Sequence, residues 1–328
     1  MKNLAIILLL SAPTWAAVTG TVVNGTTGQP QGGATVGFDR LTQNGPERVD
    51  QAKSDSQGKF TINQQPQGPS LLHTEIGGVV YNLMIPPGVP AAGLTLDVYN
   101  SSTKPGAAKV TKHMILLQPT GGQVTVNETY LYENTGKVSW NDPGHGTLHF
   151  FVPAGAGGKV EVNGTPPGGL PIAATVSKSS EANVYKVDFP VRPGETRFDL
   201  AYTVPYKEGA DYAGKVITKD ENTYLIVPNG VTIAGANLED MGTEPRTQAH
   251  IYGLSAAAYK VKLTGQVAAA PDAAADSGAG QSDDGPQIEQ IMPRLYGKAG
   301  VIVAVSLGIL ALGFALLYRK ESHERGRG

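Results

Sequence analysis

The chain of 328 residues contains no cysteine. This absence excludes disulfides, thiol nucleophiles and thiolate metal sites. A secreted domain of this chain must then be held by core packing alone, which domains of about 100 residues or more can achieve. The chain also has no large excess of positive or negative charge, since its formal net charge is -2. Because nucleic-acid-binding proteins carry a basic patch or stripe, the sequence predicts no nucleic-acid partner.

The common hydrolase motifs are missing as well. The chain has no Gly-x-Ser-x-Gly nucleophile elbow and no His-Glu-x-x-His zinc motif. His113 lies in a predicted strand, where a structural role is the more common one. The sequence therefore predicts that the protein is not an enzyme and has no catalytic residue, cofactor or metal ligand.

His145 and His149 are the histidine pair that most invites a metal-site interpretation. Pro143, Gly144 and Gly146 argue against a helix that would place both rings on one face. Four residues of extended strand separate two side chains by ~13 Å, whereas a zinc ligand lies ~2 Å from its ion. We therefore expect turn and strand histidines here and no metal site.

Four aspartates near the C-terminal end raise the question of a calcium loop. Their spacing does not match an EF-hand, and the segment around them is rich in Ala, Gly and Ser. They are Asp272, Asp276, Asp283 and Asp284. We interpret residues 265–298 as an acidic linker followed by a juxtamembrane segment.

One long apolar run is present, at residues 299–318 (AGVIVAVSLGILALGFALLY). It contains no charged residue, and Lys298, Arg319 and Lys320 flank it. A helix of this length rises roughly 30 Å, which is the thickness of the hydrocarbon core of a bilayer. The run predicts a single transmembrane helix.

A second, shorter apolar run lies near the N-terminus and is typical of a bacterial signal peptide. Lys2 precedes the run, and cleavage after Ala16 places the small residue Thr14 at the third position before the cut. A cleaved signal 1–16 and one later membrane helix predict an ectodomain in the periplasm or outside the cell. The basic tail 319–328 is then cytoplasmic.

The ectodomain sequence predicts short strands joined by tight turns, with 42 glycines and 23 prolines. The expected strands of the first half are 18–23, 34–38, 59–62, 71–76, 79–85, 95–98 and 110–117. Gly77-Gly78 marks a two-residue hairpin, and Asp55 with Gly58 marks another turn. We place the end of the first domain at residue 117, before a break at Gly121-Gly122.

The second half continues the β pattern. Apolar residues alternate at Val124, Val126, Tyr130 and Tyr132, with Glu128 in their midst. Further strands are expected at 147–152, 184–189, 198–204, 224–227, 249–252 and 259–263. Short strands with regular turn signals favour an Ig-like sandwich.

Part of the first half resembles the carboxypeptidase regulatory-like family, and the resemblance covers about 100 residues. The residues that carry it are Gly20, Val22, Asn24, Thr27, Gly28, Gln29, Pro30, Gly33, Ala34, Val36, Asp55, Gly58 and Phe60. The resemblance implies a small prealbumin-like β-sandwich that accompanies catalytic domains without supplying catalysis. The second half is similar to ectodomains of bacterial membrane-anchored proteins that carry such a domain first. Glu128, Asn134 and the run from Arg192 to Thr196 carry that second likeness.

The aromatic residues bear on whether the chain presents a sugar-binding platform. Trp140 is the only tryptophan that remains after cleavage of the signal. Tyr130 and Tyr132 share one face of their strand, as core residues do. We therefore expect these rings in the core and keep a glycan platform as the alternative.

Together these observations predict an all-β ectodomain of two tandem sandwiches, at 17–117 (prealbumin-like) and 118–264 (Ig-like), plus the membrane helix. The predicted function is that of a membrane-anchored, extracytoplasmic binding or scaffolding protein that contacts a protein or envelope partner. The alternatives are a carbohydrate-binding module on a membrane tether and an envelope hydrolase with an unrecognised site.

Overall fold

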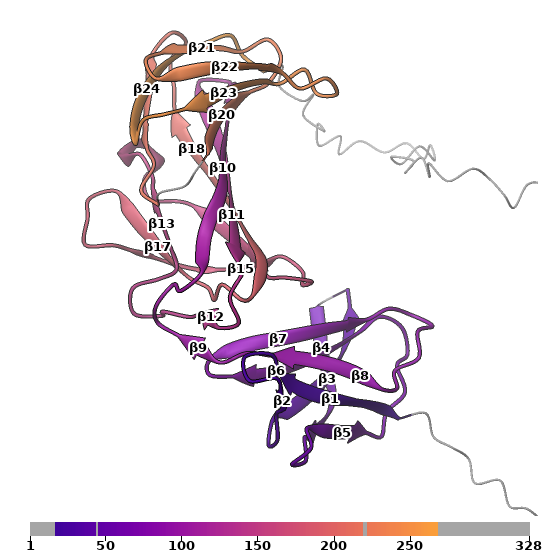
Figure 1. The fold of residues 1–328 in the computed structure, drawn as a ribbon. Helices are drawn as coiled ribbons and strands as arrows, with labels where there is room; N and C mark the ends of the chain where they lie inside the picture. The colour runs from indigo at the N-terminus through magenta and orange to yellow at the C-terminus, as the bar shows by residue number, and fades with distance from the viewer. Residues whose placement is uncertain (1–16, 44, 219–221, 268–328) are drawn as a thin grey trace, which may run out of the picture. The chain divides into compact units, whose positions relative to one another are not determined.

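The computed structural model describes residues 17–43, 45–218 and 222–267. These residues form 24 strands and one short 3-10 helix, and no α-helix occurs among them (Figure 1). The all-β prediction is confirmed for this part of the chain. The expected signal 1–16, the aspartates from Asp272 onward and the expected span 299–318 lie outside the described residues. Within those residues, no helix is long and apolar enough to cross a membrane.

Two sheets are built from the first eight strands. One sheet has the order β4-β3-β6-β7, and the other has the order β2-β1-β5 with β8 parallel to β1. The strands are β1 (Val18–Asn24), β2 (Gln29–Pro30), β3 (Thr35–Thr42), β4 (Gly45–Lys53), β5 (Lys59–Ile62), β6 (Ser70–Ile76), β7 (Val79–Ile85) and β8 (Leu94–Val98). The expected strands over this range are confirmed, whereas β4 was not predicted because its residues are mostly polar.

The first core lies between these two sheets. Val22 of β1 and Leu96 of β8 pack in one cluster with Phe38 of β3 and Leu72 of β6. The predicted turns are confirmed as well. Gly77 and Gly78 both have positive φ, at 58° and 75°, and join β6 to β7 as a two-residue hairpin.

The second core is surrounded by three sheets. The largest has eight strands in the order β15-β14-β18-β11-β10-β20-β23-β22, and two three-stranded sheets have the orders β13-β17-β16 and β19-β24-β21. The strands of the large sheet are β10 (Ala108–Thr120), β11 (Gln123–Asn134), β14 (Glu161–Thr165), β15 (Ile172–Ala173), β18 (Gly194–Pro205), β20 (Thr223–Val227), β22 (Leu238–Thr243) and β23 (His250–Leu254). The other two contain β13 (Leu148–Phe151), β16 (Thr175–Lys178), β17 (Val184–Asp188), β19 (Asp211–Lys215), β21 (Thr232–Gly235) and β24 (Ala258–Thr264).

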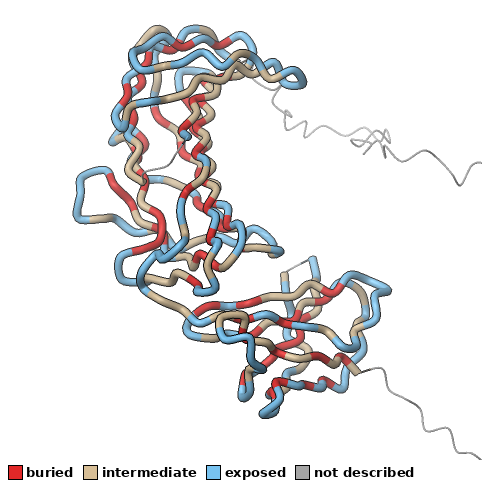
Figure 2. The backbone as a smooth tube through the Cα atoms, viewed as in Figure 1, coloured by how far each residue is buried: buried red, intermediate tan, exposed pale blue. Residues whose placement is uncertain are grey.

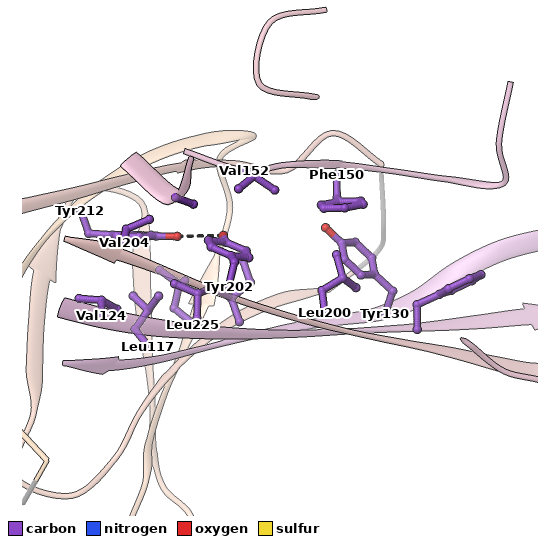
Figure 3. Close-up of a cluster of buried hydrophobic side chains, with 14 of the residues drawn as sticks. Leu117, Val124, Tyr130, Phe150, Val152, Leu200, Tyr202, Val204, Tyr212 and Leu225 are labelled. Carbon is purple, nitrogen blue, oxygen red and sulfur yellow. Dashed lines mark hydrogen bonds between the residues drawn. The ribbon is translucent and has the colours of Figure 1, made fainter. Parts of the chain in front are cut away.

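Burial alternates along the long strands of the eight-stranded sheet, as Figure 2 shows. Successive side chains of a strand point to opposite faces, so one face of the sheet packs on the core and the other does not. Side chains of the two small sheets join the core on the inner face. Phe150 of β13 and Tyr212 of β19 lie in one buried cluster with Tyr130, Leu200 and other inner-face residues (Figure 3). We call the opposite side the outer face.

The boundary expected at residue 117 falls inside β10. Residues 110–117 belong to β10, which pairs along its length with β11 through the Gly121-Gly122 turn. These two glycines have φ values of 57° and 84°, so they form a hairpin like Gly77-Gly78 and not a break between domains. The first core includes Val98 and Tyr99, and the second begins with Ala108 and Val110, so the two cores divide between residues 99 and 108.

Polar contacts link the two cores at this division. The two-residue strand β9 (Ser101–Ser102) pairs with β12 (Ser139–Trp140). The hydroxyl of Tyr81 lies 2.8 Å from the hydroxyl of Ser139. Arg192 is buried, donates from Nη1 to the carbonyl of Val80 at 3.1 Å, and lies 5.6 Å from the centre of the Tyr81 ring. Arg192, which sequence reasoning noted only as part of a turn, is therefore a contact residue between the cores.

Candidate functional site

His145 and His149 lie on different local structures, as predicted. His145 is exposed in the turn before β13, and its Nδ1 lies 3.0 Å from Oδ2 of Asp142. The backbone N–H of His145 also donates to Asp142, and this contact lowers the pKa of the Asp142 carboxyl. His149 lies within β13 and is half-buried. Among the described residues, no group of three or more His, Asp or Glu side chains could hold a metal ion.

A cluster of Asp39, Arg48 and His73 lies on the side of the β4-β3-β6-β7 sheet away from the first core. Asp39 accepts from Arg48 Nε at 2.6 Å, and its other oxygen lies 2.9 Å from Nδ1 of His73. Arg48 Nη2 lies 2.5 Å from Nε2 of His73. This geometry fits a neutral imidazole that accepts from Arg48 at Nε2, with its Nδ1 close to the Asp39 carboxylate but outside hydrogen-bond geometry.

Burial lowers the pKa of His73 below its ordinary value. The charge of Asp39 opposes this shift, and the charge of Arg48 adds to it. Because Arg48 occupies the nitrogen that a catalytic base would use, the cluster is organised as a structural contact between β3, β4 and β6.

Glu128 lies on the inner face of the eight-stranded sheet and is buried in the second core. Tyr202 donates to Oε1 of Glu128 at 2.7 Å, and Tyr130 donates to Oε2 at 3.1 Å. Nε2 of the buried His113 lies 3.0 Å from the same Oε2. Sequence reasoning marked Glu128 as a carboxylate among apolar positions, and the structure shows how its oxygens are satisfied.

The tyrosine hydroxyls extend this network through the core. The hydroxyls of Tyr202 and Tyr212 lie 3.1 Å apart, as the dashed line in Figure 3 marks. Burial, with the charge of Glu128 adding to it, raises the pKa of Tyr130 and Tyr202 well above the ordinary value, so both hydroxyls stay protonated donors at neutral pH. Since Glu128 is 5% exposed, the network joins core elements and offers no carboxylate to a ligand from solvent.

The outer face of the same sheet carries side chains in register across neighbouring strands. One row consists of Asn163, Asp199, Thr129, Met114, Tyr224, Gly253 and Glu239. The next row consists of Glu161, Ala201, Asn127, Leu116, Ile226 and Ile251. Polar side chains therefore gather on β14, β18 and β11, and apolar ones gather on β10 and β20.

A hollow of about 420 Å³ lies where these two groups meet. Its polar part includes Asp199, whose Oδ1 accepts from Thr129 at 2.7 Å and from Arg197 Nη2 at 2.7 Å. Met114 and Leu116 line its apolar part. The strands beneath are fully paired with one another, so the hollow has a rigid floor and is bounded by side chains.

A second hollow of about 480 Å³ adjoins the first, because Glu161 and Ala201 line both. Lys159 and Thr203 belong to this second hollow. We refer to the two together as the outer-face trough. It lies across β14, β18 and β11, with β10 and β20 at one end.

Sequence reasoning did not predict this surface. The alternating pattern of β11 and β18 identifies the buried positions, and it does not indicate that the polar residues between them form one surface. The available signal was the recurrence of Asn, Thr, Asp and Arg at the positions between Val126, Tyr130, Phe198 and Tyr202. Their assembly depends on the register between β11 and β18, which one sequence does not specify.

Comparison with known proteins adds no identification. No protein-family model matches the chain, and no curated protein matches it. The resemblance of the first half to carboxypeptidase regulatory-like domains therefore stays a prediction.

Proposed function

We propose that this protein is an extracytoplasmic binding protein, held to a membrane by residues 299–318, that acts by contact and not by catalysis. The observation that carries the proposal is the outer-face trough. It combines charged, carboxamide and aliphatic side chains on a rigid sheet, as binding sites commonly do. The two apolar segments of the sequence and their flanking charges support the anchored topology.

The arrangement of the titratable groups supports contact over chemistry. Glu128 is enclosed in the core with two tyrosines and His113, and His73 is held between Asp39 and Arg48. A general base must reach the proton that it abstracts. These groups are instead oriented toward one another.

The same proposal assigns a fold type to each half of the ectodomain. The two sheets of the first core form a prealbumin-like sandwich, and the three sheets of the second core form an Ig-like variant with an enlarged sheet. The turn residues that carry the family resemblance support the first assignment. Among them, Gly20 packs against Phe60, leaving no room for a Cβ atom.

Site-specific crosslinking tests the proposal, because a chain without cysteine accepts a single engineered one. Asn163→Cys places a thiol on the exposed polar edge of the trough, and Ala258→Cys places a matched exposed thiol on β24. Both full-length variants are labelled with a benzophenone maleimide in native membranes and irradiated.

We expect a defined crosslinked product from position 163 that is absent from position 258. The same products from both positions, or no product from position 163, would contradict the proposed surface.

A further inference from the structure

We infer that the outer-face trough binds a neutral oligosaccharide. This inference rests on the proposed function, since it names the chemical class of the ligand for the same surface. It depends on three properties of the trough, namely the donors and acceptors in it, its balance of charge, and the pairing of the strands beneath it.

The polar side chains present donors and acceptors side by side. Asn127 and Asn163 each carry an amide that donates and a carbonyl that accepts, and the Asn127 amide also donates to Gln118. Arg197 donates from Nε and Nη2 to Oδ1 of Asp199, which leaves Nη1 of Arg197 and Oδ2 of Asp199 to meet a ligand. Neighbouring hydroxyls of a sugar ring both donate and accept. A planar amide or a carboxylate–guanidinium pair can therefore engage two adjacent hydroxyls at once.

The apolar side of the trough suits the other surface of a sugar ring. Met114, Leu116 and Ile226 are half-buried side chains on adjacent strands. The C–H face of a pyranose can pack on such a surface while its hydroxyls point toward β11 and β18. Tyr130 and Tyr202 point into the core, and Tyr224, beside Met114, is the aromatic residue of the two outer-face rows. Recognition here therefore depends mainly on hydrogen bonds and aliphatic contact instead of a platform of several rings.

Charge in the trough is balanced. Glu161 and Asp199 contribute two negative charges, and Lys159 and Arg197 contribute two positive charges. Glu128 also lines the first hollow, but its carboxylate is enclosed in the core by Tyr130 and Tyr202. A lining without excess charge gives no electrostatic preference for a polyanion or a polycation. Balanced charge with many hydrogen-bonding groups favours an uncharged polar ligand.

The position of the trough argues against a bound peptide strand. Extended peptides bind proteins by adding to a sheet edge, where backbone donors and acceptors lack partners. The trough instead covers β18 and β11, which pair with a strand on each side. Its ligand must be held by side chains. Because two hollows adjoin, a chain of several sugar units fills the trough better than one unit.

Isothermal titration of the full-length protein in nanodiscs tests the inference. The probes are three neutral trisaccharides (maltotriose, cellotriose and tri-N-acetylchitotriose), a printed array of neutral glycans, and trigalacturonate as the matched anion. Asn163→Ala removes an exposed amide of the trough, and Asn229→Ala removes an exposed amide from the turn after β20, which does not line the trough. Melting temperatures check that both variants fold.

We expect at least one neutral glycan to bind and trigalacturonate to bind no better than it. Asn163→Ala should weaken that binding about five- to tenfold, which corresponds to one lost hydrogen bond, and Asn229→Ala should not change it. No binding to any neutral glycan, or equal binding by both variants, overturns the inference. A protein crosslinked from position 163 together with no glycan binding would support the proposed function and refute only the claim that the ligand is a saccharide.

Discussion

At the residue scale, the main feature of the second core is that one carboxylate is buried with a full set of donors. Glu128 lies between aliphatic neighbours in its row, with Leu200 on one side and Ile115 on the other. An unpaired carboxylate in such a place would be strongly destabilising. The hydroxyls of Tyr130 and Tyr202 and the ring of His113 compensate for the burial of the Glu128 carboxylate.

Removal of this carboxylate should therefore destabilise the fold. Glu128→Ala leaves two buried tyrosine hydroxyls and His113 without their acceptor, and we expect a loss of about 3 kcal/mol in the free energy of unfolding. Urea unfolding of the detergent-solubilised chain, followed by the fluorescence of Trp140, measures it. Glu133→Ala, an exposed carboxylate on the same strand, is the control and should change stability little. Equal effects of the two substitutions would contradict the account of the network.

The His73 cluster predicts a pH dependence. Because the pKa of His73 is lowered in the folded state, the unfolded chain binds a proton more readily. The stabilising contribution of neutral His73 is therefore complete above the unfolded pKa of about 6.5 and is lost as pH falls through the folded value.

We expect the wild-type protein to lose more stability than His73→Gln when the pH is lowered from 7.5 to 5. Melting temperatures of both proteins across this range provide the measurement. A wild-type protein that loses no more stability than the variant would show that His73 is not held neutral by this cluster.

At the element scale, the strongest determinant of the second half is the β10–β11 hairpin. Its turn uses Gly121 and Gly122, both with positive φ, and the ladder continues from Thr120 paired with Gln123 to Ala108 paired with Asn134. β10 and β11 then support β20 and β18 on their free edges. A side chain that disfavours positive φ at the turn should weaken the whole ladder.

Gly122→Val should destabilise the protein by about 1–2 kcal/mol, because a β-branched residue is strained at a φ of 84°. Gly121→Asn creates an Asn-Gly pair, which favours the same two-residue turn, and should be tolerated. Thermal unfolding of the two variants beside the wild type distinguishes them. A tolerated valine at position 122 would mean that this turn does not hold the register.

Alternating apolar residues predicted some strands at this scale, such as 59–62, which matches β5. A flanking turn signal predicted others, such as 79–85 after Gly77-Gly78, which matches β7. Sequence reasoning missed strands such as β4 and β22, whose side chains are mostly polar and exposed. It also took Gly121-Gly122 for a break, although the same dipeptide signal had indicated a hairpin at Gly77-Gly78. The outer-face trough could not be predicted, because it requires the register between strands that are far apart in sequence.

At the scale of the whole molecule, the division between the cores determines which parts of the chain can fold independently. The first core ends with Tyr99, and the second begins with Ala108. The segment between them contains Lys104 and Pro105, which are exposed and lie outside both cores.

A cut after Lys104 should give two fragments that each unfold cooperatively with a β-type circular dichroism spectrum. A cut after residue 117 separates most of β10 from β11, which pair along their length, and should leave the C-terminal fragment unfolded. The two pairs of fragments can be compared by thermal melts at matched concentration. Folding of fragment 118–267 without β10 would show that the hairpin is not required for the second core.

The central claim is that the outer-face trough contacts a partner in the native membrane, and the reaction rate of a single thiol measures this most directly. Asn163→Cys and Ala258→Cys are each treated with a membrane-impermeant maleimide, once in native membranes and once after purification. We predict that the thiol at position 163 reacts several-fold more slowly in native membranes, whereas the thiol at position 258 reacts at the same rate in both. Equal rates for position 163 in the two preparations would contradict the claim.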